Sequence, residues 1–308
     1  MSETDICQRF LINDRGLRGQ WTLLEASYQT VLAKHDYPLE IQGLLGELLA
    51  ASILLSATLK FEGTLSIQAR GEGTINLLSV ECTHDHTVRA IARWQGDTRG
   101  QSFRELLGKA ILAITITPSQ GERYQGIVPL DGDTVAQCLE HYFQSSEQLK
   151  TQIQLFHGNN RAGGLLLQAL PGTGGSLEGA EQVLHGQSYE EQQEARAEEW
   201  HRVAGLAATL SAEELLNLDC NTVLYRLFHE EKVQVFAPEM VRFHCTCSRQ
   251  RTANALEQIG REELDSILAE RGKVDVTCQF CNEHYVFDPV DVAMLFAAGN
   301  PQADSSIN

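Results

Sequence analysis

Basic residues are scarce in this sequence. Its 308 residues include 24 Lys and Arg against 41 Asp and Glu, a formal net charge of −17. Proteins that bind DNA, RNA or anionic membranes without sequence preference need clustered Lys and Arg. This shortage argues against a nucleic-acid or membrane partner.

Apolar runs long enough to span a membrane are also missing. The most apolar stretch, LLGELLAASILLSATL at residues 44–59, is shorter than the about 20 residues that a span requires, and it contains Glu47. We therefore predict a buried helix over residues 39–60. The first residues, MSETDICQRF, are acidic where a signal peptide is basic and then apolar, so we expect a cytoplasmic protein.

Motifs of several enzyme classes are absent as well. The sequence contains no GxxxxGK[ST] phosphate-binding loop, no HExxH motif and no HxE…PCxxC deaminase signature. The glycines near residues 71–73 and 172–175 are expected in turns. We predict that the protein is not an enzyme.

Charge divides the chain into three parts. Residues 1–177 carry a net charge of −4 and residues 233–308 a net charge of −5. Residues 178–232 hold 12 acidic and 4 basic side chains, a net charge of −8, and they follow a Gly-rich segment. We predict a core domain at 1–177, an acidic helical linker at 178–232 and a C-terminal domain at 233–308.

The first part mixes strand and helix patterns. Helices are predicted at residues 39–60 and after an Asp133 cap. Strand patterns occupy residues 61–70, 74–82, 88–94, 110–117, 150–156 and 164–170. Helices do not alternate regularly with strands, so we predict an α+β fold rather than a doubly wound sheet.

The linker is predicted to form marginally stable helices. Ser188 with Glu191, and Ser211 with Glu214, have the spacing of capping boxes. The first helix begins with almost no apolar residues, so it needs an apolar face docked elsewhere. We expect this face to cover the N-terminal sheet as a latch. Its residues are Trp200, Val203, Leu206 and Leu210.

Four of the eight cysteines form two close pairs. The sequences are CTC at 245–247 and CQFC at 278–281. Two close pairs separated by a small subdomain are typical of zinc held by four thiolates, and metal commonly supplements the core of so small a domain. We predict one zinc ion. Its ligands are Cys245, Cys247, Cys278 and Cys281.

The residues around these pairs predict a small fold. Strands at 273–277 and 284–287 would form a hairpin with the second pair at its tip. Ser248 would cap a helix that ends at Gly260, a second helix would span 261–270, and a terminal helix would follow Asp288. A hairpin context argues against a thioredoxin-like motif, and four thiolates leave no open position for catalysis.

The other ligand candidates are weaker. His244 and His284 flank the motif, but four cysteines already complete a zinc shell, so we expect both histidines outside it. Cys82 and Cys138 lie on apolar faces and are predicted in the core. Cys220 lies in the linker, where opening would expose it, and the sequence assigns no role to Cys7.

The Cys-X-Cys pair suggests a switch. A disulfide across one residue closes a small, strained ring, so this couple should be relatively oxidising. Zinc holds the sulfurs as thiolates, which peroxide and hypochlorous acid attack. Oxidation of the ligand pairs would remove the metal and the free energy that folds the domain.

The chain resembles a known family, the 33 kDa redox-regulated heat-shock chaperones, which are cytosolic bacterial holdases. The resemblance is carried by CTC…CQFC, by residues 44–82 and by RAGGLLLQALP at 161–171. It covers essentially the whole chain.

This resemblance implies a mechanism. The reduced, zinc-bound form would be inactive, and oxidation would form the disulfides Cys245–Cys247 and Cys278–Cys281. Zinc loss would unfold the C-terminal domain and linker, and the exposed apolar surface would bind unfolding client proteins without ATP. The oxidised form would be a homodimer.

Two alternatives remain open at this point. A zinc ribbon with four cysteine ligands could bind nucleic acid, although Arg242, Arg249 and Arg251 are the basic residues near the motif. A thiol oxidoreductase is the other, and turnover of insulin disulfides would support it.

Overall fold

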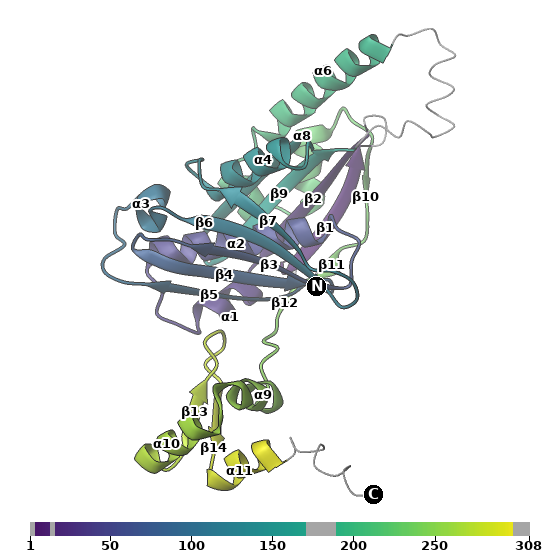
Figure 1. The fold of residues 1–308 in the computed structure, drawn as a ribbon. Coiled ribbons are helices and arrows are strands. Elements are labelled where there is room, and N and C mark those ends of the chain that lie inside the picture. The colour runs from purple at the N-terminus through teal and green to yellow at the C-terminus, as the bar shows by residue number, and fades with distance from the viewer. Residues whose placement is uncertain (1–3, 13–15, 171–188, 298–308) are drawn as a thin grey trace, which may run out of the picture. The chain divides into compact units, whose positions relative to one another are not determined.

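The computed structural model describes residues 4–12, 16–170 and 189–297 (Figure 1). The chain forms two compact units, residues 1–244 and residues 245–308. Each unit has its own hydrophobic core. The mixture of helices and sheets confirms the predicted α+β class.

The first unit contains two six-stranded sheets. The first sheet has the order β10-β1-β2-β9-β8, with β11 also paired to β1, and its pairs are antiparallel. Its strands are β1 (Ile6–Ile12), β2 (Leu17–Leu24), β8 (Thr151–Gly158), β9 (Arg161–Ala169), β10 (Val233–Val235) and β11 (Glu239–Met240).

The second sheet has the order β12-β5-β4-β3-β6-β7. Its β12–β5 pair is parallel, whereas the others are antiparallel. Its strands are β3 (Gly63–Arg70), β4 (Ile75–Thr83), β5 (Thr87–Trp94), β6 (Ile111–Pro118), β7 (Tyr124–Pro129) and β12 (Arg242–Phe243).

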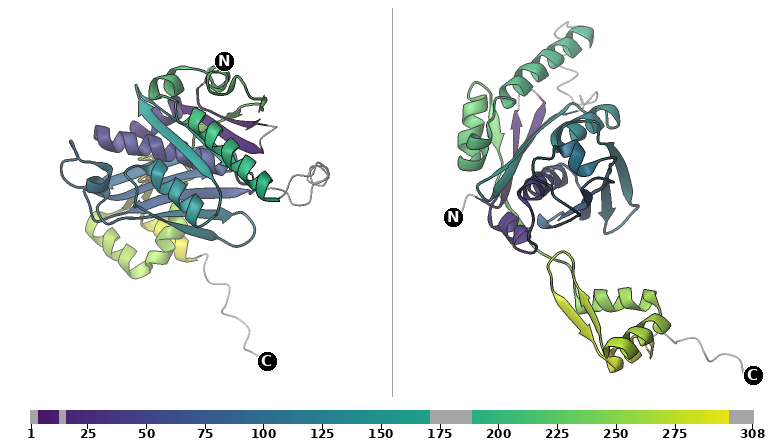
Figure 2. Two further views of the ribbon diagram at one scale, coloured as in Figure 1. Left: turned by 90° about the horizontal axis from the view of Figure 1, so that it is seen from above. Right: turned by 90° about the vertical axis from the view of Figure 1, so that its left-hand side faces the viewer.

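Helix α2 (Leu39–Ser56) contacts strands of both sheets, as Figure 2 also shows. The whole 18-residue helix is long and apolar enough to span a membrane, although its apolar run was predicted to be too short. However, 78% of that stretch is buried inside the protein. A helix packed from several sides is apolar all round, so the predicted buried helix is confirmed. Three shorter helices complete this core. They are α1 (Ala26–Leu32), α3 (Phe103–Leu107) and α4 (Val135–Ser145).

The cap of α4 differs from the prediction. The Thr134 side chain, and not that of Asp133, accepts the hydrogen bond from the N–H of Gln137. Asp133 instead forms an ion pair with Arg104 at 2.8 Å. Either residue type can cap a helix, so one position cannot be told from the next by the sequence alone.

The first sheet has two buried faces. Alternation along its strands turns one set of side chains toward α2 and the other toward the helices of the predicted linker. These helices are α6 (Tyr189–Ala207), α7 (Ala212–Asn217) and α8 (Cys220–Phe228). The capping box of Ser211 and Glu214 is present, whereas Ser188 lies outside the described residues.

Close contact between sheet and linker depends on Gly19. Phe10 of β1 lies opposite Gly19 of β2, and a Cβ at Gly19 would lie 1.9 Å from the Phe10 ring. The glycine leaves room for the ring, which stands 6.1 Å from that of Phe228 in α8. Phe10 and Phe228 thus join sheet and linker in one core.

The second unit is a hairpin surrounded by helices. Its core consists of six buried residues. They are Ala253, Leu256, Leu264, Val274, Phe287 and Val292. The elements are α9 (Arg249–Ile259), α10 (Arg261–Arg271), β13 (Val274–Thr277), β14 (His284–Phe287) and α11 (Pro289–Ala297). The predicted hairpin and the helix cap at Ser248 are confirmed.

Residues 233–244 belong to the first unit, although the sequence placed them with the C-terminal domain. The physical reason is strand pairing. β10 and β11 pair with β1, and β12 pairs with β5. Strands of two or three residues leave no periodic pattern in the sequence, so this attachment could not be predicted.

Candidate metal centre

Cys245 and Cys247 lie in the loop that leads into α9. The Ser248 side chain accepts a hydrogen bond from the N–H of Arg251 at 3.2 Å and caps the helix. The Arg251 guanidinium donates to the carbonyl of Thr246 at 3.2 Å. The residue between the two cysteines is therefore tied to the first turn of α9.

Cys278 and Cys281 lie in the turn that joins β13 to β14. The N–H of Cys278 donates to the carbonyl of Glu283, and the N–H of Asn282 donates to the carbonyl of Cys278, both at 2.8 Å. Asn282 has a φ of 61°, in the left-handed region that asparagine tolerates well. This hairpin turn, without a following helix, agrees with the argument against a thioredoxin-like motif.

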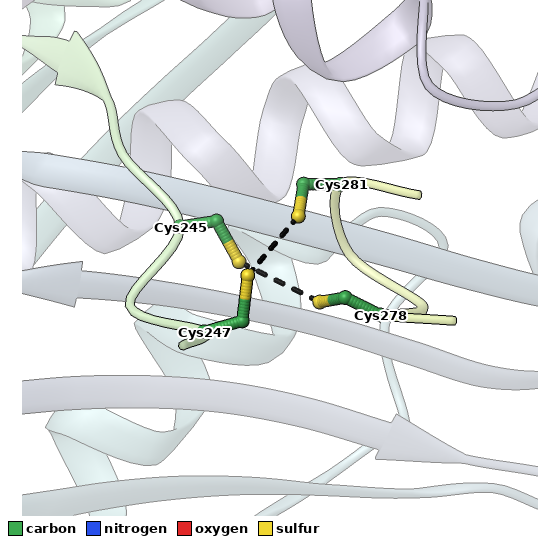
Figure 3. A group of neighbouring side chains, drawn as sticks. All are labelled: Cys245, Cys247, Cys278 and Cys281. Atoms are coloured by element: carbon green, nitrogen blue, oxygen red, sulfur yellow. Dashed lines mark hydrogen bonds between the residues drawn. The ribbon is translucent and has the colours of Figure 1, made fainter. Parts of the chain in front are cut away.

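The four sulfurs converge (Figure 3). All lie within 4.8 Å of one another. The Sγ atoms of Cys245 and Cys278 are 3.7 Å apart, and those of Cys247 and Cys281 are 3.3 Å apart. The structure thus brings together all four residues that the sequence predicted as ligands.

The donor set fits a thiophilic cation. Tetrahedral zinc with Zn–S bonds of about 2.3 Å separates its sulfurs by about 3.8 Å, close to the Cys245–Cys278 distance. All eight cysteines are thiols rather than disulfides. Burial raises the pKa of Cys247 and of Cys281, so a bound cation is what would hold these sulfurs as thiolates.

Tyr285 is a site residue that the sequence reasoning missed. Its hydroxyl donates a hydrogen bond to the Sγ of Cys247 at 3.1 Å, and its ring packs beside the core of the second unit. The signal available in the sequence was a tyrosine in the strand that follows the second cysteine pair. Spacing alone did not show that this strand brings its hydroxyl to the first pair.

The flanking histidines lie outside the sulfur cluster, as expected. The ring of His284 lies 3.1 Å from the hydroxyl of Thr277 and 3.6 Å from the carboxylate of Asp275. The backbone N–H of His244 donates to the carbonyl of Val88 at 3.0 Å, within the first unit.

A guanidinium anchors the helix that follows the first pair. Arg249 donates to the carbonyl of Val286 at 2.6 Å and to the carboxylate of Asp291 at 2.7 Å. Its guanidinium also lies 4.2 Å from the ring centre of Phe287. One residue thereby connects α9, β14 and α11 around a small core.

The remaining cysteines are all buried. Burial raises the pKa of Cys82 and of Cys220 to about 12, and raises those of Cys7 and Cys138 as well. Thiols that stay protonated react slowly with oxidants. The core position predicted for Cys82 and Cys138 is confirmed.

The predicted latch residues lie against the first sheet. Val203 is 0% exposed and Leu210 is 5% exposed, whereas Trp200 and Leu206 are half-buried beside the same core. That core includes Phe10 and Trp21 of the sheet. The four residues therefore share one docked face.

The match to a known family identifies the class of protein to which this fold and cysteine cluster belong. The sequence model of the family described as "Hsp33 protein" matches residues 5–288. The chain belongs to this family, and it is a chaperone of the Hsp33 type.

Named relatives agree over their full length. The "33 kDa chaperonin" of Pseudomonas aeruginosa (strain LESB58) is 47% identical over 308 residues, 99% of each chain. That of Hahella chejuensis is 46% identical over 295 residues, 96% of this chain and 98% of its own. These names describe chaperones rather than enzymes.

A solved structure shares the fold. The 33 kDa chaperonin of Thermotoga maritima, a heat shock protein 33 homologue, superposes with a TM-score of 0.75 at 20% identity. The match covers 96% of this chain and all of the other.

Proposed function

We propose that this protein is a redox-regulated, ATP-independent holdase of the cytoplasm. The observation that carries the proposal is the cluster of four thiols within 4.8 Å, held in a small unit of its own. A chaperone that binds apolar segments needs its binding surface covered until it is required. The cluster supplies a trigger for uncovering it.

Zinc is the ion that the donor set favours. Four thiolates in tetrahedral arrangement are a structural zinc site, and the bound ion keeps the sulfurs deprotonated and adds folding free energy. Cys245, Cys247, Cys278 and Cys281 would hold it. The second unit buries six core residues, so it depends on such a ligand more than the first unit does.

Oxidation would remove the ligands in pairs. Formation of Cys245–Cys247 and of Cys278–Cys281 takes two electrons from each pair of thiolates, and each peroxide molecule that accepts them, with two protons from solvent, becomes two molecules of water. None of the four sulfurs then remains a thiolate, so the second unit loses its metal and with it the free energy of metal binding. These pairings rest on the family resemblance.

The linker would then be released from the first sheet. Its docked face is apolar, but the segment 178–232 carries a net charge of −8, which disfavours a compact state once packing is lost. Release would expose the apolar face around Phe10 and Trp21 to unfolding client proteins. We also propose that the oxidised form is a homodimer.

The test is a client-aggregation assay without nucleotide. Zinc-loaded protein, treated with peroxide at mild heat, should suppress the light scattering of a thermally unfolding client, whereas the reduced protein should not. The quadruple variant with serine at the four cluster positions should show no dependence on oxidant. Oxidation that yields no client protection, or salt-sensitive binding of RNA or DNA instead, would contradict the proposal.

A further inference from the structure

A short segment of the first unit runs along the edges of both its sheets. We call residues 233–244 the strap. Its β10 and β11 pair antiparallel with β1, and its β12 pairs parallel with β5. Without the strap, β1 would be an edge of the first sheet and β5 an edge of the second (Figure 1).

Backbone hydrogen bonds hold most of the strap. Several of its N–H groups donate to carbonyls in or next to β1 and β5: Phe236 to Arg9 at 2.9 Å, Val241 to Asp5 at 2.8 Å, Arg242 to His86 at 3.2 Å and His244 to Val88 at 3.0 Å. Val241, at 3% exposure, is the one strap side chain that is buried. Val233, Val235 and Phe243 are half-buried against the two cores of the first unit. The strap is therefore attached through backbone hydrogen bonds, which any polypeptide could make, and through a few apolar side chains.

Polar side chains of the strap make further contacts with the first unit. Arg242 lies 3.0 Å from the Asp85 carboxylate, and Glu239 lies 3.2 Å from the ring of His86. Met240, between them, is 63% exposed. The exposed Arg242–Asp85 pair contributes little to stability, whereas the ring of His86 is buried. Val241, the half-buried side chains of Val233, Val235 and Phe243, and the backbone bonds are therefore the main attachment.

The strands under the strap are suited to pairing with another chain. β1 (ICQRFLI) and β5 (TVRAIARW) are seven and eight residues long, rich in apolar residues and without proline. An uncovered edge of this kind is a template for an added strand. Main-chain pairing recognises extended peptides with little regard to their sequence, which suits a chaperone with unrelated clients.

Chain connectivity links the strap to the cysteine cluster. The strap's last pairing bond is made by His244, and the next residue is Cys245, a candidate ligand. β11 and β12 are two residues each. Strands this short are held by few bonds and open readily when an adjoining segment unfolds.

From these observations we propose that the strap occupies the sites where extended segments of non-native client chains add as β-strands to β1 and β5. This inference rests on the proposed holdase function and adds a second binding surface to the apolar face around Phe10 and Trp21. Loss of the folded second unit frees the strap's end, and client backbone replaces it on both edges.

Residue-resolved amide hydrogen exchange tests this on the full chain. The carbonyls of Arg9 and Val88 accept bonds from the strap, so their N–H groups face the same side. The amides of Gln8 and Arg89, which face the opposite way, are internal controls. Three samples would be compared. They are the reduced protein, the oxidised protein, and the oxidised protein mixed with α-lactalbumin that has been reduced and carboxymethylated, which makes it a permanently unfolded chain.

We expect Arg9 and Val88 to be protected in the reduced protein, to exchange at least tenfold faster after oxidation, and to regain protection with the unfolded chain. The controls should change much less. In reduced protein, Val241→Ser should speed exchange at Arg9 and Val88 by about tenfold, because a buried side chain is lost. Met240→Ser, at an exposed neighbour, should leave both unchanged.

Three results would overturn the inference. The first is that the amides of Arg9 and Val88 stay protected from exchange after oxidation. The second is that they still exchange fast in a complex that does contain the unfolded chain. Protection could also return with rising concentration of oxidised protein alone, which would assign these edges to self-association. Absence of any complex with the unfolded chain, together with failure to suppress client aggregation, would instead refute the holdase function itself.

Discussion

Tyr285 is the single residue whose contact most directly bears on the reactivity of the cysteine cluster. A hydrogen bond to a thiolate withdraws electron density from the sulfur and makes it less nucleophilic. The contact at 3.1 Å involves Cys247, a member of the Cys-X-Cys pair. We therefore predict that Tyr285 is a positioning residue that restrains oxidation of this pair.

Replacing Tyr285 with Phe keeps the ring and removes the hydrogen bond. We expect peroxide to release zinc about two to ten times faster from this variant, since a typical hydrogen bond contributes about 0.5–1.5 kcal/mol and 1.4 kcal/mol is a factor of about ten. The measurement is the rate of zinc appearance with a colorimetric chelator. In cobalt-substituted protein the sulfur-to-metal absorption band should also shift. If neither the rate of zinc release nor the cobalt absorption spectrum changes, Tyr285 does not restrain oxidation of the pair.

His157 and Glu47 form a titrating pair between β8 and α2. The ring lies 3.2 Å from the Glu47 carboxylate, and this hydrogen bond holds the pKa of His157 above its usual value. A raised folded-state pKa stabilises the fold below the ordinary histidine pKa of about 6.5, and this contribution is lost as pH rises through the folded pKa.

The prediction is that Glu47→Gln lowers the pKa of His157, as measured by NMR titration of the ring. The thermal midpoint of the wild-type first unit should fall more than that of the variant between pH 6 and pH 8. Because the His157 side chain is 45% exposed, the difference should be small. A pKa that does not move in the variant would show that the carboxylate is not its cause.

At the scale of elements, α6 and the turn that follows it are held to the first sheet by a few apolar side chains. The double substitution Val203→Ser and Leu210→Ser removes two side chains that are almost fully buried. Each costs about 1.5–3 kcal/mol of burial, enough to shift docking by one or more orders of magnitude. We expect client protection without oxidant while the zinc content stays at one per chain.

Light scattering of a heated client, measured beside metal content, checks this prediction. His201→Ser is the matched control, because His201 lies exposed in the same helix and should leave the protein inactive when reduced. If the double variant keeps its zinc and still gives no protection, linker docking is not what covers the binding surface.

Local signals in the sequence predicted elements well where those signals were strong. The serine caps at Ser211 and Ser248, the strands on either side of the second cysteine pair and the buried helix were all found as predicted. Each depends on residues within a few positions of one another.

Several elements were missed, among them the strap, whose partners lie far away in the sequence. The sequence did not predict β1, β2, β7 and α8. It placed the strap in the C-terminal domain, whereas the strap's contacts place it in the first unit. The strap's strands exist because β1 and β5 offer edges, which no pattern within residues 233–244 reveals. The contact of Tyr285 with Cys247 was hidden for the same reason.

At the scale of the whole molecule, the two units should respond differently to metal removal. The first unit has two large cores, whereas the second has six buried core residues. Chelation of zinc under reducing conditions should therefore unfold residues 245–297 and leave the amides of α2 protected. Hydrogen exchange measures both units in one sample. Continued protection of the β13 and β14 amides without metal would show that the second unit does not need the metal to fold.

The central claim is that one event, oxidation of the cysteine cluster, both releases the metal and turns on client binding. The most direct measurement follows zinc release and client protection in the same sample during peroxide treatment and during later reduction with zinc present. Our account predicts that protection rises as zinc is released, at one zinc per chain, and disappears as the thiols and metal are restored. Full protection while zinc remains bound, or complete zinc release with no protection, would contradict it.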